Sequence, residues 1–272
     1  MHFHFPFTTA QVLWTLTFAA QLTLLVVLLG RDRIKRFPWF TASIVLFSVR
    51  LLIEVLLSGR LAPPALRIVF ITMADLMALV GLLVVAEMAR RAFGGVQRRT
   101  WVLWTVAAVA VGCAVMATWG PWPAWKDLTR DASLAVLRVM QLLAQKADML
   151  MDVLTVELGL LIVLFGRRYG AGWRSHTQRI VIGLWTVATS WLLVQGSWQI
   201  IATSVHPHTQ EEYERIIGLG AKLVNANKVV YIAALLWWIA SLWVDEPGSA
   251  TVEAAAEPVE APTAEEPPQL AE

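Results

Sequence analysis

The sequence predicts an all-α polytopic membrane protein, a bundle of seven transmembrane helices with its N-terminus outside and its C-terminus inside. Of the 272 residues, 57% are hydrophobic and the mean hydropathy is +0.60, whereas soluble domains contain about 45–50% apolar residues. Seven apolar stretches are long enough to cross a bilayer core of about 30 Å, which needs about twenty helical residues. Basic residues gather in alternate loops, as in a bacterial-type inner membrane protein.

The seven predicted spans follow one another with short connections. They lie at about residues 9–29, 37–58, 66–89, 100–119, 133–165, 178–204 and 217–244. The fifth is about 33 residues long, or about 50 Å at 1.5 Å per residue, so its first turns are expected to stand above the membrane. An odd number of spans places the two termini on opposite sides.

The loops predict which side is which. The first, third and fifth loops carry Arg31, Arg33, Lys35 and Arg36, then Arg90, Arg91, Arg98 and Arg99, then Arg167, Arg168, Arg174 and Arg179. These loops are therefore predicted to be cytoplasmic. The alternate loops carry interfacial aromatics and acids, namely Trp119, Trp122, Trp125, Glu211, Glu212 and Glu214.

The chain divides into residues 1–244, the transmembrane domain, and residues 245–272, a tail rich in Ala, Glu and Pro with eight acids and no base. Such a tail cannot bury enough apolar surface to order itself, so it is predicted to be disordered and cytoplasmic. The N-terminus lacks the basic start of a secretory signal and is expected to be mature structure. The basic membrane domain is explained by the lipid surface, and no nucleic-acid partner is expected. Cys113 stands alone, which excludes an internal disulfide and a thiolate metal cluster.

Four charged residues are predicted to share one layer. Counted inward from the outer ends of their spans at 1.5 Å per residue, Arg50, Asp75, Asp152 and Lys228 lie roughly 5 to 12 Å below the outer surface. Charges in hydrocarbon are costly unless they pair inside the bundle. The second, third, fifth and seventh spans are therefore expected to meet there, with Gln195 of the sixth nearby.

The fifth span carries a polar stripe. Arg138, Gln141, Gln145, Asp148 and Asp152 recur three or four residues apart and so share one helix face. This face predicts an outward-facing pocket between the second, third, fifth, sixth and seventh spans. The alternative is that the same groups only stabilise helix packing through buried hydrogen bonds. The predicted ligand-binding residues are Arg50, Glu54, Asp75, Gln141, Gln145, Asp148, Asp152, Gln195, Asn225 and Lys228.

Two sequence matches suggest a duplication of three helices around a fourth. Residues 21–31 resemble residues 157–167, and residues 51–54 resemble residues 192–195. A three-plus-one-plus-three repeat occurs in small-solute transporters, although apolar sequences also match by chance. Gln21 and Glu157 would both lie near the midplane, where Glu157 could relay protons or serve as a protonated packing residue.

Three other kinds of site fit the sequence less well. Lys228 in a seventh span would permit a retinal Schiff base, but Val224 stands one turn before it where a counter-ion would be needed. His2, His4, His206 and His208 could bind metal but lie on a terminus and a loop. Glu211-Glu212-Tyr213-Glu214-Arg215 is one residue shorter than the glutamate and arginine signature of intramembrane CAAX-type proteases, sits in a predicted loop and has no histidine partners on a helix.

The sequence therefore predicts a non-enzymatic protein without cofactor or metal. A small-solute or ion transporter is the first expectation. The alternative is a receptor or accessory subunit that binds a ligand or a protein partner whose identity the sequence does not contain.

Overall fold

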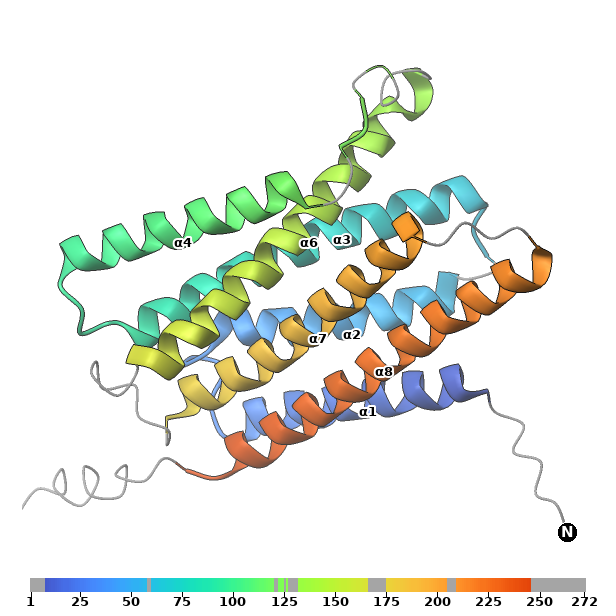
Figure 1. The fold of residues 1–272 in the computed structure, drawn as a ribbon. Coiled ribbons are helices and arrows are strands. Elements are labelled where there is room, and N and C mark those ends of the chain that lie inside the picture. Colours follow the sequence, from blue (N-terminus) through green and yellow to red (C-terminus); the bar gives the residue numbers. More distant parts are fainter. Residues whose placement is uncertain are drawn as a thin grey trace, which may run out of the picture.

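The computed structural model describes residues 8–57, 60–119, 122–124, 126, 132–165, 175–204 and 209–245, whose regular structure is entirely helical. The helices are α1 (Thr9–Gly30), α2 (Pro38–Leu57), α3 (Pro63–Ala92), α4 (Arg98–Thr118), α6 (Ala132–Phe165), α7 (His176–Ser204) and α8 (Gln210–Trp243). Figure 1 shows long helices in alternating directions: α1, α3, α6 and α8 run one way, and α2, α4 and α7 run the other.

Six of these helices, all except α6, are long and apolar enough to cross a membrane. They indicate a multi-pass membrane protein, as predicted from composition. The remaining helix, α6, coincides with the fifth predicted span but carries five charged side chains, Arg138, Lys146, Asp148, Asp152 and Glu157. Its crossing of the membrane stays a prediction.

Helix boundaries follow local capping chemistry. The Thr8 hydroxyl and the Gln11 side chain cap α1 reciprocally. After α1, Asp32 has a φ of 50° and the Arg33 amide donates to the Leu28 carbonyl over 2.9 Å, which closes the helix end.

One boundary corrects the sequence analysis. Helix α8 begins at Gln210, so residues 211–215, predicted to lie in a loop before a span starting at 217, form its exposed first turns. The Thr209 hydroxyl accepts a hydrogen bond from the Glu212 amide. The negative side chains of Glu211 and Glu212 interact favourably with the positive N-terminal end of the helix dipole.

Six helices form a closed ring in the order α1, α2, α3, α6, α7, α8, with α8 packed back against α1. Helix α4 packs against α6 from outside this ring, and lies along one edge of the bundle in Figure 1. Helix α3 also touches α7 across the ring.

The two ends of the ring differ. We call the end where α1, α3, α6 and α8 finish the basic end, because it gathers Arg31, Arg33, Lys35, Arg36, Arg90, Arg91, Arg99 and Arg179; the opposite end is the far end. The hydrophobic core lies in the half of the ring toward the basic end, where Leu24, Leu28, Phe37, Phe40 and Leu235 are fully buried.

Tryptophan side chains fill space left by glycines in this core. Trp238 is 1% exposed, packs edge-on against Phe40 and lies where a side chain at Gly183 would have to be. Its indole N–H donates to the Ile180 carbonyl over 3.1 Å. These contacts lock α8 against α2 and α7 at the basic end.

The suggested duplication is compatible with the ring but not with the sequence match in α1 and α6. The order α1-α2-α3 followed by α6-α7-α8 places equivalent helices opposite one another, as two three-helix repeats would. However, the match pairs the fully buried Leu24 and Leu28 with Leu160 and Leu164, which are 45% and 70% exposed. The matched residues therefore lie on non-equivalent faces, as expected of chance similarity between apolar helices.

Candidate functional site

A central cavity of about 450 Å³ lies inside the ring. Its walls come from α2, α3, α6, α7 and α8, which correspond to the second, third, fifth, sixth and seventh predicted spans. Its charged lining residues are Arg50, Asp148, Asp152 and Lys228. Because a cavity among helices with a few polar groups is the usual form of a ligand site in a bundle, this is the candidate site.

The polar groups are concentrated toward the far end of the cavity. On α2, the lining runs from Phe40 at the basic side to Arg50 at the far side, about 15 Å apart at 1.5 Å per residue. On α8 it runs in the same sense from Trp238 through Lys228 and Asn227 to Val224. The cavity is therefore polar at one end and apolar at the other, and the buried core closes it at the basic end.

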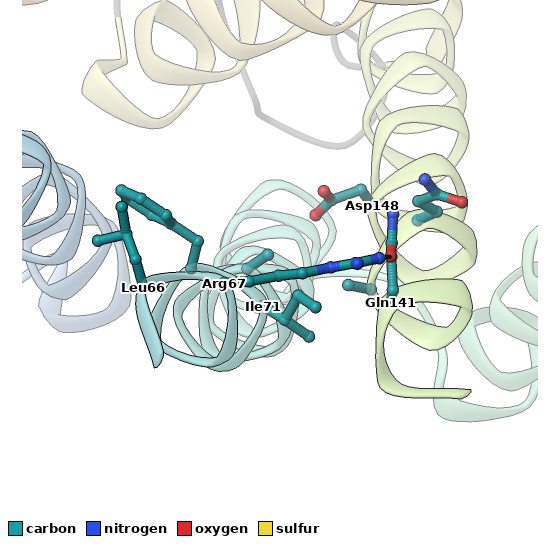
Figure 2. A pocket seen from close by; sticks show the side chains of 9 residues that line it. Leu66, Arg67, Ile71, Gln141 and Asp148 are labelled. Atoms are coloured by element: carbon teal, nitrogen blue, oxygen red, sulfur yellow. Dashed lines mark hydrogen bonds between the residues drawn. The ribbon is translucent and has the colours of Figure 1, made fainter. Parts of the chain in front are cut away.

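A second cavity of about 440 Å³ lies between α3 and α6. Figure 2 shows Arg67 reaching across it, and its Nη2 donates to Gln141 Oε1 over 2.6 Å. Gln145 and Asp148 line it too, and Asp148 also lines the central cavity. The polar stripe of α6 therefore leads from the second cavity to the central one.

The four charged residues predicted to share one layer form no direct ion pairs with one another. Among the described residues, Arg50, Asp75, Asp152 and Lys228 make no salt bridge; Arg50 Nη1 instead lies 3.4 Å from the Met77 sulfur. Asp148, which the layer did not include, interacts electrostatically with both Arg50 and Asp75. The predicted pairing of Arg50 and Lys228 with Asp75 and Asp152 is thus not seen, and the acid on which Arg50 acts electrostatically is Asp148.

Two cavity-lining side chains carry buried oxygens without hydrogen-bond partners among the described residues. They are Asp152, whose Oδ2 is unpaired and whose side chain belongs to a residue only 5% exposed, and Asn227, whose Oδ1 is unpaired. Buried polar atoms are normally paired in folded proteins. The two oxygens, on residues of the cavity wall, are therefore acceptors that the described part of the protein leaves unsatisfied.

A hydrogen-bonded network supports the wall behind the cavity. Gln21, 1% exposed, donates from Nε2 to the Tyr231 hydroxyl over 3.1 Å and accepts from the Ser48 hydroxyl over 3.1 Å. The network ties α1, α2 and α8 together and fixes Tyr231, which lines the cavity. Gln21 was predicted at the midplane, and its role here is structural.

The structure separates the predicted ligand-binding residues into three groups. Arg50, Asp148, Asp152 and Lys228 line the central cavity, and Gln141, Gln145 and again Asp148 line the second one. Asp75 interacts with Asp148 but lines neither of the two cavities. Neither do Glu54, which is exposed, or Gln195 and Asn225, which are half-buried. The Lys228 side chain is itself largely exposed, at the rim of its cavity.

Glu157 lies away from the cavity. Its neighbours at helical spacing, Leu150 and Leu154, touch Gly112 of α4, so Glu157 belongs to the α4-facing side of α6. Both of its carboxylate oxygens are buried without a hydrogen-bond partner among the described residues. This position gives no support to a proton path through the central cavity.

Several functional candidates were missed by the sequence analysis. Arg67 was not considered, and Asn227 was passed over for Asn225, two residues earlier on the same helix. The signal for Asn227 was its spacing: it lies four residues before Tyr231, so the two share a helix face. His2, His4, His206 and His208 lie outside the described residues.

Comparison with known proteins adds no homologue: no protein-family model, curated protein or solved structure matches this chain.

Proposed function

We propose that this chain is a non-enzymatic inner-membrane protein that binds a small solute or ion in the central cavity and carries it across the membrane. The observation that carries this proposal is the cavity itself, walled by five helices, polar toward the far end and closed by buried aromatics at the basic end. A cavity that is polar on one side and closed on the other fits one state of an alternating-access transporter.

The orientation in this proposal places the basic end in the cytoplasm and the cavity mouth outside. It is supported by the arginines of the basic end: Arg31 lies on the loop joining α1 to α2, and Arg99 and Arg179 lie in the first turns of α4 and α7. Asp245, after α8, accepts from Arg31 and Arg33 at this same end.

A topology experiment tests the orientation. A reporter fused after Val244 should be active in the cytoplasm, and a cysteine at His208 should react with an impermeant thiol reagent added outside. Protection of position 208 from outside reagent, with reactivity from inside, would reverse the orientation.

A receptor or accessory subunit is the second candidate function, and one observation favours it. The cavity wall toward the basic end is mostly apolar, with Phe40, Val84 and Leu184 among its members, and among the described lining residues no charged side chain continues inward from Asp152. A protein that only binds its ligand has no need of a polar path inward.

Accessibility measurements separate the two candidates. In a Cys113→Ser background, Trp191→Cys samples the polar part of the cavity and Val85→Cys the apolar part. If the chain transports, Val85→Cys should react with an impermeant reagent from the basic-end side and Trp191→Cys from the far-end side. A Val85→Cys variant that never reacts from the basic-end side would leave the receptor as the function. No reaction at Trp191→Cys from the far-end side would contradict an open cavity in either role.

A further inference from the structure

The central cavity contains a carboxylate without a matching cation. Asp152 is 5% exposed, its Oδ2 has no hydrogen-bond partner among the described residues, and it lines the cavity. A buried carboxylate is costly unless it is paired or hydrogen-bonded. A cationic group entering the cavity would supply what Asp152 lacks.

The cations already present are placed elsewhere. Arg50 contacts the Met77 sulfur and acts electrostatically on Asp148, one turn from Asp152 on α6, and Lys228 is exposed at the rim. The electrostatic neighbour of Asp152 is Asp148, which is another acid. The local field at Asp152 therefore favours a positive charge.

A second oxygen accompanies Asp152. Asn227 also lines the cavity, and its Oδ1 is buried and has no hydrogen-bond partner among the described residues. An ammonium group has several N–H donors and no acceptor, so it is satisfied by acceptors such as a carboxylate and an amide oxygen. A ligand anion would leave both oxygens unpaired.

The rest of the wall suits an apolar body next to that charge. Phe47, Trp191 and Tyr231 supply aromatic rings, and Met77 and Met151 supply polarisable thioethers. Aromatic faces attract organic cations, with Trp and Tyr among the strongest. The cavity volume of about 450 Å³ is in the range of small-molecule sites.

We infer that the ligand of the central cavity is an organic ammonium cation with an apolar body, held by the Asp152 carboxylate and the Asn227 amide oxygen. This inference rests on the proposed function, since it names the class of solute that the cavity binds. Arg50 and Lys228 stay outside the ammonium subsite and limit the cavity to one added positive charge.

Calorimetric titration of the full chain in lipid nanodiscs tests this inference with three probes of similar size. They are 2-phenylethylammonium, the neutral 2-phenylethanol and the anion phenylacetate. The ammonium should bind at least about tenfold more tightly than the other two, because a hydrogen bond to a charged group contributes about 1.5–3 kcal/mol and 1.4 kcal/mol is a factor of ten.

Variants then locate the subsite. Asp152→Asn should weaken ammonium binding at least about tenfold, and Asn227→Ala, which leaves Asp152 intact if the first variant folds poorly, should weaken it severalfold. The matched control is Glu157→Gln, an acid-to-amide change on the α4-facing side of the same helix, which should leave affinity unchanged.

Equal affinity for 2-phenylethylammonium and 2-phenylethanol overturns the inference, as does undiminished ammonium binding in both cavity variants. Equal affinity leaves the cavity as a solute site, so the proposed function stands; undiminished binding in both variants places the ammonium outside the proposed subsite, and cysteine accessibility then decides the proposed function. If none of the three probes binds, the ammonium inference again fails, and the cysteine accessibility at positions 85 and 191 decides the proposed function independently.

Discussion

The two halves of the helical ring use their side chains differently. Toward the basic end, large residues such as Leu28, Phe37 and Trp238 are fully or almost fully buried and interlock. Toward the far end, no described residue of α2 after Ser48, of α7 after Ala188 or of α8 before Ala234 is buried. The basic half contains the large packed core, whereas in the far half the buried residues lie on α3 and α6, such as Met77 and Met149, beside the cavity.

This difference shows how one bundle can assign stability to one half and ligand binding to the other. Close packing contributes most of the folding free energy, and it leaves no room for a ligand. Polar groups such as Asp152 and Asn227 are tolerated in the loosely packed half because the tightly packed half holds the helices in place. Substitutions at the basic end should therefore change stability more than substitutions at the far end.

The largest expected effect is at Trp238. Trp238→Ala should lower the free energy of unfolding by about 3–5 kcal/mol, since it empties a large core position. Its neighbour Trp237 also donates its indole N–H to a carbonyl of α7 but is 47% exposed, so Trp237→Ala should cost about 1 kcal/mol or less. Denaturation in mixed micelles measures both, and equal losses would contradict the burial of Trp238 in the core as the cause of its larger effect.

A smaller effect is expected at Glu87. Its carboxylate, buried in α3, accepts the Phe40 amide proton over 3.1 Å at the start of α2 and lies 3.6 Å from Arg91. Glu87→Ala leaves that amide unpaired and should cost about 1–3 kcal/mol, and Glu87→Gln should restore part of it. Glu54→Ala, an exposed acid on α2 in the far half, is the control and should stay within about 0.5 kcal/mol. A loss at Glu54 as large as that at Glu87 would show that the far half also stabilises the fold.

The charged residues of the far half give the next prediction. Arg50→Ala should cost about 1 kcal/mol, less than for a fully buried ion pair, because Arg50 is half-buried and makes no salt bridge among the described residues. In a double-mutant cycle, Arg50 should couple to Asp148 by at least about 0.5 kcal/mol and less to Asp152. Stronger coupling to Asp152, measured by thermal unfolding of the single and double variants, would mean that Asp152 already has its counter-ion.

The smallest effect concerns Lys146, which is 9% exposed on α6. Its Nζ donates to the Trp119 carbonyl over 2.8 Å at the end of α4 and lies 4.3 Å from the Trp122 ring centroid. Lys146→Met keeps the apolar stem and removes the charge at the negative helix end, worth about 0.3–1 kcal/mol. Hydrogen exchange should become faster in the last turn of α4 only. Faster exchange throughout the ring would assign Lys146 a role in the whole bundle.

The sequence predicted the helices well because their signals are local. Length and apolar content identified all seven helices, and the polar stripe of α6 indicated the face on which Asp148 and Asp152 line the cavity. The rotation of each helix was harder to predict, since it depends on packing against its neighbours. Asn225 and Asn227 differ by about 200° around α8, and only contacts made by distant helices decide which of them lines the cavity.

Pairing between charges was beyond prediction for a related reason. Residues at equal depth can lie on opposite sides of a ring, so depth alone placed Asp75 and Asp152 in one layer without ordering them around it. The Arg67–Gln141 contact joins residues 74 positions apart in the sequence, and the Lys146–Trp119 contact joins residues 27 positions apart. No local pattern marks such partners.

Helix α4 lines neither cavity, and only 6% of its apolar stretch is buried. The presence of α4 sets the direction in which the following helices run. Because α4 returns the chain to the far end, α6 starts there and runs parallel to α3, as α8 runs parallel to α1 (Figure 1). Without α4, helices α6, α7 and α8 would each run in the opposite direction along the bundle axis. Asp152 and Asn227 would then lie at a different height along that axis from Arg50. A helix that touches no ligand thereby determines that the two halves of the binding wall face the same compartment.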